Sequence, residues 1–261
     1  MMWKCRERTI DLSRTRVMGI VNITPDSFSD GIPTSRTEIA ISRARAHWNA
    51  GADILDLGAE STRPGATPLP WQAEWARLEP VLRILRRELP SAPLSVDTYH
   101  PETAEKALAG GASILNCVYS EPVPDFLHLA QASGCGLVIP VPDAPPPEDL
   151  RGQILVDPMI GFASTRQEDL ARLAGLDALA RRYPVLVGVS RKRLIGMITK
   201  TTSPTDRLGG SVGAALWCAL HGASVVRVHD VKETRQALDV LNLLDAQLPE
   251  KGERPWTQPT F

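Results

Sequence analysis

Residues 17–31 have the sequence Val17-Met-Gly-Ile-Val-Asn22-Ile-Thr-Pro-Asp-Ser-Phe-Ser-Asp-Gly31, in which a short apolar run is followed by a polar loop. An apolar run without alternation is typical of a parallel strand that is buried on both faces. The loop is too polar and too long for a plain connection. A buried strand that carries polar groups at its C-terminal end is the basic unit of an α/β active site.

This unit recurs along the chain. Further strands are predicted for residues 53–58, 93–97, 113–116, 136–140, 154–157, 184–189 and 224–229. Helices are predicted for residues 35–50, 71–89, 101–109, 122–132, 167–183, 206–221 and 232–248. Eight strands that alternate with helices predict an α/β fold, a (β/α)8 TIM barrel. We expect one barrel domain over residues 1–248 and a disordered C-terminal tail over residues 249–261.

One helix of the barrel is missing from this pattern. Residues 140–153, between the fifth and sixth strands, are rich in proline and leave room for at most one helical turn. An extended link of a dozen residues reaches roughly 40 Å, more than the roughly 20 Å length of a strand, so a helix is not needed for the return. The outer apolar face of these two strands then needs cover from the link or from a partner.

Composition limits the classes of partner. The 261 residues carry a net charge of −1, which gives no electrostatic reason to expect nucleic acid or an acidic membrane as a partner. The chain has no apolar run near the roughly 20 residues that span a bilayer, and residues 1–15 lack the apolar centre of a signal peptide. Four scattered cysteines without CxxC spacing predict reduced thiols in a cytoplasmic protein. A small substrate is therefore expected.

Barrel closure would gather the polar residues at the strand ends into one mouth. They are Asn22, Glu60, Arg63, Asp97, Asn116, Asp157, Lys192, Arg227 and His229. Lys192, Arg227 and His229, together with Arg191, lie at the ends of the last two strands, where barrels commonly bind phosphate, while Arg63 lies on the loop after the second strand. The carboxylates and Asn116 suit a ring rich in N–H donors, such as a pterin or a purine. The mouth is thus divided into an anion half and a ring half.

Six motifs, in this order, resemble those of the dihydropteroate synthase family. They are Asn22-x-Thr24-Pro-Asp-Ser-Phe-Ser-Asp-Gly31, Glu60-Ser-Thr-Arg-Pro-Gly65, Ser95-Val-Asp-Thr98, Asp157-Pro-x-Ile-Gly-Phe162, Gly188-x-Ser-Arg-Lys192 and Arg227-Val-His-Asp230. The resemblance implies an enzyme of folate biosynthesis, a transferase. It would condense 6-hydroxymethyl-7,8-dihydropterin pyrophosphate with p-aminobenzoate and release pyrophosphate, with Mg²⁺ as cofactor.

The resemblance also implies roles for single residues. Asp97, Asn116, Asp157 and Lys192 match the pterin site, and Asn22, Arg63, Arg227 and His229 match the diphosphate binders, with Asn22 also near Mg²⁺. Thr62, Pro64 and Arg193 match the p-aminobenzoate pocket, and Phe162 is placed with the substrate-binding residues. As catalytic residues we expect Asn22, Arg63, Asp97, Lys192, Arg227 and His229. Loops 22–35 and 59–70 match loops that close over the substrates, and a homodimer through the late helices is implied, with Leu216, Trp217 and Leu220 as candidates.

Several residues depart from the family pattern, all near the ring half. Cys117 replaces an aspartate after Asn116, and Ile139-Pro140 replaces a Met-His pair, which we expect to make one wall of the pterin pocket aliphatic. Met159 replaces a glycine and Ser164 a lysine. Two alternatives therefore remain open. One is a paralogue that binds a pterin or a diphosphate without this chemistry, and the other is a pterin-dependent methyltransferase, which would not need cations around a diphosphate.

Overall fold

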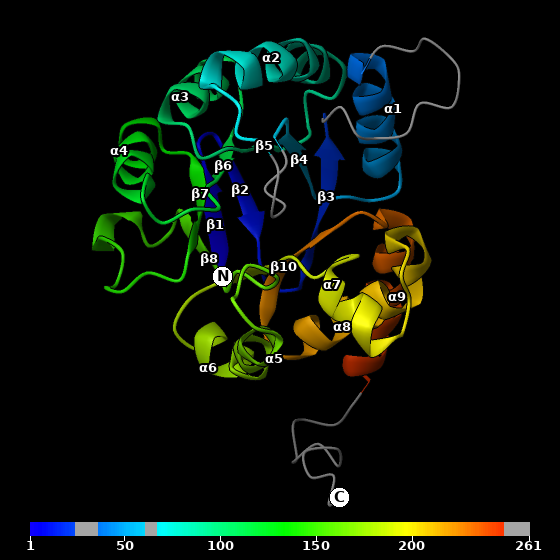
Figure 1. The fold of residues 1–261 in the computed structure, drawn as a ribbon. Coiled ribbons are helices and arrows are strands. Elements are labelled where there is room, and N and C mark those ends of the chain that lie inside the picture. The colour runs from blue at the N-terminus through cyan, green and yellow to red at the C-terminus, as the bar shows by residue number, and fades with distance from the viewer. Residues whose placement is uncertain (24–35, 61–66, 248–261) are drawn as a thin grey trace, which may run out of the picture.

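A computed structural model describes residues 1–23, 36–60 and 67–247 (Figure 1). The strands are β1 (Met2–Cys5), β2 (Arg8–Asp11), β3 (Arg16–Asn22), β4 (Ile54–Gly58), β5 (Leu94–Asp97), β6 (Ile114–Asn116), β7 (Gly136–Pro140), β8 (Ile154–Asp157), β9 (Val185–Val187) and β10 (Ala223–Val228). Strands β3 to β10 form a closed parallel barrel in chain order, with β10 pairing with β3. The predicted (β/α)8 barrel is confirmed.

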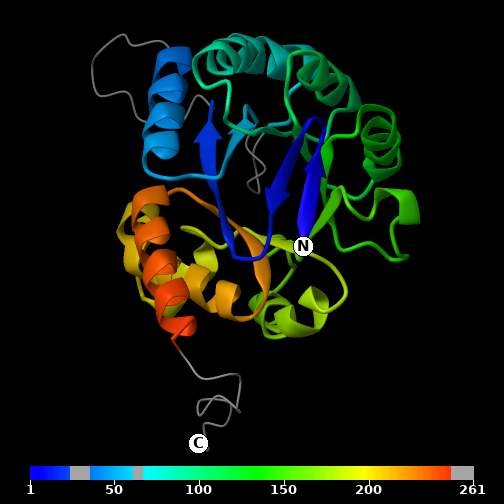
Figure 2. The same cartoon turned by 180° about the vertical axis from the view of Figure 1, so that it is seen from behind.

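The helices surround this barrel (Figure 2). They are α1 (Arg36–Asn49), α2 (Trp71–Glu88), α3 (Pro101–Ala109), α4 (Val123–Ser133), α5 (Arg166–Ala174), α6 (Leu176–Ala180), α7 (Arg193–Ile198), α8 (Leu208–Leu220) and α9 (Val231–Asp245), with short 3-10 turns η1 (Glu148–Leu150) and η2 (Pro204–Arg207). The single helix predicted over residues 167–183 is wrong, because Gly175 separates α5 from α6. The short helix α7 and the hairpin of β1 and β2 were not predicted. Residues 249–261, the expected tail, lie outside the described chain, as does residue 248.

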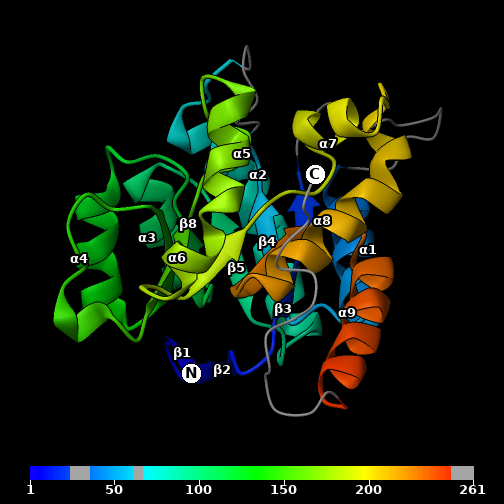
Figure 3. The ribbon, with the colours of Figure 1, turned by 90° about the horizontal axis from the view of Figure 1, so that it is seen from below.

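The amino-terminal hairpin closes the lower end of the barrel (Figure 3). Trp3, Cys5 and Ile10 of the hairpin are buried against one apolar layer inside the barrel. That layer consists of Met18, Ile54, Ile114, Val138, Leu155, Leu186 and Val225. Burial of this apolar surface removes it from water and is the main favourable contribution at this end.

The Pro-rich link itself covers the gap left by the missing helix. Between β7 and β8 the chain forms only the turn η1, which confirms the prediction of at most one helical turn. Leu150 of that turn is buried in the same cluster as Ile139 and Ile154 on the outer barrel face. The hairpin supports the link, because Trp3 Nε1 donates to the Gln153 carbonyl at 2.6 Å. The apolar face of β7 and β8 is therefore covered from within the chain.

Candidate active site

Above the apolar layer the barrel interior becomes polar. Asp56, Asn116, Asp157 and Arg227 each follow a residue of the apolar layer by two positions. Because side chains alternate along a strand, these four also point toward the barrel axis, one step nearer the C-terminal ends. The same alternation places Cys117 and Ile139 on the outside of the barrel.

The strand ends are in register at the mouth. Asn22 pairs with Gly58, Gly58 with Asp97, and Asp97 with Asn116. Two strands on, Pro140 pairs with Asp157. The structure thus brings together the residues predicted to lie at the ends of these strands.

Arg227 is the centre of the polar layer. Its Nε donates to Asp56 Oδ2 and its terminal nitrogen Nη2 to Asp97 Oδ2, each at 2.6 Å. Two carboxylates raise the pKa of the Arg227 guanidinium above its already high value, so it stays charged. Asn116 Nδ2 donates to Asp56 Oδ2 at 3.3 Å, while Asn116 Oδ1 is buried without a hydrogen-bond partner among the described residues. A buried acceptor of this kind is available to a ligand donor.

Asp97 and Asp157 have raised pKa values. Burial is the main cause for both, because desolvation disfavours a charged carboxylate. The pKa of Asp97 rises to about 7, with Arg227 opposing the rise and Asp56 adding to it. For Asp157 the nearby Lys192 opposes the rise. Asp97 is therefore able to change protonation near neutral pH, and Asp157 holds its proton more strongly than an exposed aspartate does.

Lys192 crosses the mouth from the loop after β9. Its Nζ donates to the Ile160 carbonyl and lies 5.1 Å from the centre of the Phe162 ring, within the range of a cation–π contact. Burial lowers the pKa of Lys192 to about 8, against the attraction of Asp157. Gly161 makes room for this side chain, because a Cβ at position 161 would come 2.8 Å from Lys192 Cδ.

Two strained residues support this part of the site. Met159 and Arg191 have φ values of +58°, a left-handed conformation that costs a non-glycine residue roughly 1–2 kcal/mol. The Met159 carbonyl accepts from Arg172 at 2.8 Å, and Asp169 accepts from the Gly161 amide at 2.7 Å. Arg191 is ion-paired with Asp230. The loop that carries Asp157 is therefore fixed by α5, although Met159 replaces the family glycine.

The remaining predicted residues are placed as follows. Asn22 is half-buried at the end of β3, and His229 follows β10 with its backbone N–H donating to Ser190 Oγ at 3.2 Å. Arg193 begins α7 and is exposed. Residues Thr62, Arg63 and Pro64, and most of the predicted loops 22–35 and 59–70, lie outside the described chain. Glu60 is hydrogen-bonded within the protein, because its Oε1 accepts from the Tyr99 hydroxyl at 2.7 Å.

Two of the departures have local consequences. The Cys117 thiol donates to the Tyr119 carbonyl, and burial raises the pKa of this thiol to about 12, so it is an inert packing residue and not a reactive group. The expectation that both Ile139 and Pro140 make a pocket wall aliphatic is wrong for Ile139. Ile139 packs in the outer cluster because Val138, next to it, faces inward. Pro140 alone faces the mouth.

Sequence reasoning missed Asp56, and it gave no role to Ser95, whose hydroxyl donates to Asp56 Oδ1 at 2.5 Å. The signal was present, because a carboxylate in the middle of the apolar run 54–58 is rare unless it is paired. Asp169 and Arg172, which hold the loop after β8, were missed because their helix positions look like an ordinary solvated face.

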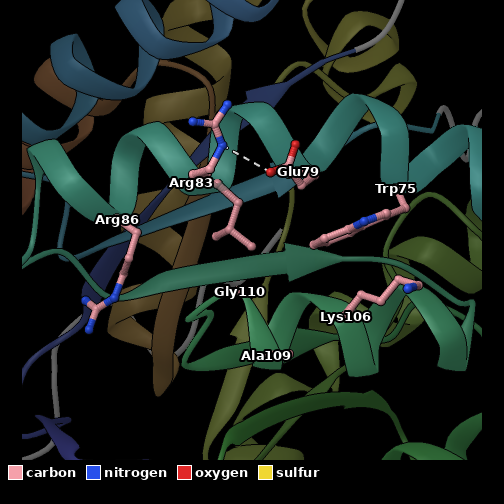
Figure 4. Close-up of a pocket in the computed structure, with 8 residues that line it drawn as sticks. Trp75, Glu79, Arg83, Arg86, Lys106, Ala109 and Gly110 are labelled. Atoms are coloured by element: carbon pink, nitrogen blue, oxygen red, sulfur yellow. Dashed lines mark hydrogen bonds and ion pairs between the residues drawn. The ribbon is translucent and has the colours of Figure 1, made fainter.

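One cavity of about 370 Å³ lies away from the mouth (Figure 4). It is a groove on the outside of the barrel between α2 and α3, with Trp75 and Leu82 beside Arg83, Arg86 and Lys106. The predicted site residues do not line it, and its Arg83 is paired with Glu79 at 3.1 Å. The buried carboxylates and cations that could take part in a reaction lie at the mouth and not in this groove.

Comparisons with known proteins agree with this site. A family model described as a pterin binding enzyme matches residues 18–150 and 149–229. Dihydropteroate synthase of Escherichia coli K12 is 34% identical, over 89% of this chain and 93% of that protein. The enzyme of Neisseria meningitidis serogroup C is 36% identical, over 95% of this chain and 99% of that protein.

Solved structures give the same result. Xanthomonas albilineans dihydropteroate synthase with 4-aminobenzoic acid has a TM-score of 0.86 and 37% identity, over 95% of this chain and 100% of that one. The same enzyme in complex with 7,8-dihydropteroate has a TM-score of 0.83 and 35% identity, over 95% and 100% of the two chains. The match therefore extends over nearly the whole length of both chains.

Proposed function

This chain belongs to the dihydropteroate synthase family, and we propose that it condenses 6-hydroxymethyl-7,8-dihydropterin pyrophosphate with p-aminobenzoate to give 7,8-dihydropteroate and pyrophosphate. The observation that carries the proposal is the polar wall formed by Asp97, Asn116, Asp157 and Lys192 around Arg227. It joins buried acceptors to fixed cations in a single barrel mouth.

The acceptors of this wall bind the pterin ring. Asp97, Asp157 and the unpartnered Asn116 Oδ1 accept from the ring and amino N–H groups of a pterin, and Lys192 and Phe162 lie beside it. Carboxylates at this position favour positive charge on the ring, which develops as the leaving group departs. Pterin recognition therefore also serves the chemical step.

The cationic side of the mouth receives the diphosphate. Arg227, His229, Asn22 and Arg63 are its ligands in this proposal. Arg227 already gives Nε and Nη2 to carboxylates, so its other terminal nitrogen, Nη1, is the donor for the diphosphate. In this proposal Arg193, Thr62 and Pro64 contact p-aminobenzoate. Of these three, Arg193 lies at the start of α7.

The reaction needs positioning more than a strong base. The amine lone pair of p-aminobenzoate forms the new C–N bond, and the C–O bond to the diphosphate breaks with its electron pair on the diphosphate. The amine proton passes to solvent. Because an aniline nitrogen is weakly basic and carries a free lone pair, holding it in line with the C–O bond supplies much of the rate gain.

The residues at the mouth fit a Mg²⁺ ion bound mainly through substrate. The described residues contain no group of three or more His, Cys, Asp or Glu side chains that could hold a metal. Mg²⁺ is often held by one or two protein oxygens together with substrate phosphates, and the half-buried Asn22 amide offers one such oxygen. When bound, the ion would neutralise charge on the leaving diphosphate.

In this proposal the protein assembles as a homodimer. It is located in the cytoplasm. Trp217 and Leu220 of α8 are exposed, as are Val240, Leu243 and Leu244 of α9, while Leu216 packs against the core. An exposed apolar patch on two neighbouring helices favours a partner surface.

All four cysteines are free thiols, which supports a reducing compartment. Among the described residues, no helix has both the length and the apolar character needed to cross a membrane.

A product assay tests the activity. Purified protein with Mg²⁺ and both substrates should form dihydropteroate, and Asn22→Ala should lower the rate strongly. Lack of turnover at micromolar enzyme would refute the proposal. The shortened barrel does not favour the inactive paralogue, because the link covers the exposed strands. Cations around the anion half count against a methyltransferase.

A further inference from the structure

Asp56 is a fully buried carboxylate in the polar layer of the barrel. It lies in the middle of β4, and none of its surface is exposed to solvent. A charged group is rarely buried this completely unless its partners compensate for the loss of water. Asp56 must therefore act, if it acts in the reaction, through the residues that it holds.

The partners of Asp56 come from three other strands. Its Oδ2 accepts from Arg227 of β10 at 2.6 Å and from Asn116 of β6 at 3.3 Å, and its Oδ1 accepts from Ser95 of β5 at 2.5 Å. Arg227 and Asn116 belong to the substrate wall described above. One carboxylate therefore fixes two substrate-facing groups on opposite sides of it.

Asp56 also decides which groups remain available to the substrate. Asn116 gives its N–H to Asp56, so its oxygen is left as the free acceptor. Arg227 gives Nε to Asp56, so its guanidinium plane is fixed by two carboxylates and not by Asp97 alone. Without Asp56, Asp97 would be the sole counter-ion of Arg227 and would be drawn away from a ligand.

We propose that Asp56 is a positioning residue for this reaction, which holds the Arg227 guanidinium and the Asn116 amide in the orientation that the substrate meets. The inference rests on the proposed function, because these orientations matter only if the pterin substrate binds to Arg227 and Asn116. It extends that function by one residue that the sequence motifs do not contain.

The chain provides a matched control in the same segment. Asp53, three residues earlier, is also paired with arginines, at 3.3 Å from Arg16 and 3.4 Å from Arg235, and its Oδ2 accepts from the Val17 amide. These contacts lie at the opposite end of the strand from the mouth. Asp53→Asn and Asp56→Asn therefore remove the same charge from comparable ion pairs, but only the second touches the substrate wall.

The experiment compares the kinetics of wild type, Asp53→Asn and Asp56→Asn over a range of pH. In Asp56→Asn the new amide N–H faces the donors of Arg227 and Asn116, so kcat/KM for the pterin substrate should fall about a hundredfold, as for a misplaced catalytic group. The acid limb of the pH profile should also move to lower pH, because burial still raises the Asp97 pKa but the added effect of the Asp56 charge is gone. Asp53→Asn should change only the thermal stability.

Two results would overturn the inference. One is an Asp56→Asn protein with wild-type kinetics and an unshifted pH profile, and the other is an equal loss of activity in both variants. If Asp56→Asn does not fold, Ser95→Ala decides, because it frees one oxygen of Asp56 and keeps the charge. A several-fold rise in KM for the pterin with an unshifted pH profile supports the inference, and a wild-type KM refutes it. An inactive wild-type protein would instead refute the proposed function itself.

Discussion

Met159 donates its backbone N–H to Asp157 Oδ1 at 2.7 Å while its own φ is +58°. The hydrogen bond orients one of the two carboxylates of the ring half, and the left-handed backbone is what allows it. A side chain in this conformation is strained, and the contact of Arg172 with the Met159 carbonyl compensates for part of that strain.

Met159→Gly should therefore stabilise the protein. Relief of the left-handed strain is worth roughly 1–2 kcal/mol, and about 1 kcal/mol of this is offset by the greater freedom of glycine in the unfolded chain. We expect a gain of at most about 1 kcal/mol in the free energy of unfolding, measured by urea titration. Met159→Ala keeps a Cβ and should show no gain. An equal gain in both variants would mean that side-chain bulk, and not φ, is the cause.

The activity should depend on pH with two limbs. The pKa of Asp97 is raised to about 7 and that of Lys192 is lowered to about 8. If the carboxylate and the ammonium are the active forms, kcat/KM should rise as the pH passes about 7 and fall as it passes about 8. Lys192→Arg should abolish the alkaline limb, because a guanidinium stays charged. An unchanged alkaline limb in that variant would remove Lys192 from this role.

Asp97 should also make stability depend on pH. Its pKa in the folded protein lies above the ordinary value of 3.8, so the folded state holds the proton more strongly than the unfolded state. The carboxyl therefore favours folding most at acid pH, and this contribution is lost as the pH rises from about 4 to about 7. Asp97→Asn should remove that part of the pH dependence in thermal melts between pH 5 and 8. A variant with the wild-type slope would contradict this.

The link between β7 and β8 should depend on one leucine. Leu150 is 2% exposed and Val141, in the same link, is 46% exposed. Leu150→Ala should cost about 2–5 kcal/mol of unfolding free energy, because it leaves a cavity over the outer strand face. Val141→Ala should stay within about 0.5 kcal/mol of wild type. Equal effects would mean that the link does not replace the missing helix.

The exposed patch on α9 should control the oligomeric state. Leu243→Asp introduces a charge at a residue that is 65% exposed. In a homodimer formed through this patch, burial of that charge is costly, so light scattering should show a shift toward monomer. Leu170→Asp on α5, at 47% exposure, is the control and should leave the mass unchanged. A wild-type protein that is already monomeric would refute the proposed dimer.

The barrel was predictable because its strands are compact apolar runs, most of which have a polar residue at or just after their end. The same pattern did not reveal Asp56, because this carboxylate lies inside the apolar run 54–58 and not at its end. The hairpin of β1 and β2 escaped prediction because its strands have only four residues each, and together they bury only Trp3, Cys5 and Ile10. The six residues of α7 are too few for a helical period to be recognised.

The contacts of Lys192 with Ile160 and Phe162 were beyond prediction for a different reason. They join loops that are 30 or more residues apart. The spacing of the motifs predicts which strand each loop follows, but it does not predict which side chains of two loops touch. The roles assigned to Thr62, Arg63 and Pro64 stay predictions, because these residues lie outside the described chain.

The amino-terminal hairpin has a consequence for the order of assembly during synthesis. Trp3 donates to Gln153, 150 positions later, and the Arg6 amide donates to the Gly134 carbonyl. A nascent chain cannot make these contacts until Gly134 and Gln153 have left the ribosome. The end of the barrel that the hairpin closes is therefore among the late parts to form. Until then Trp3 and Ile10 remain open to water, and a chaperone that binds apolar segments would find its target in this hairpin.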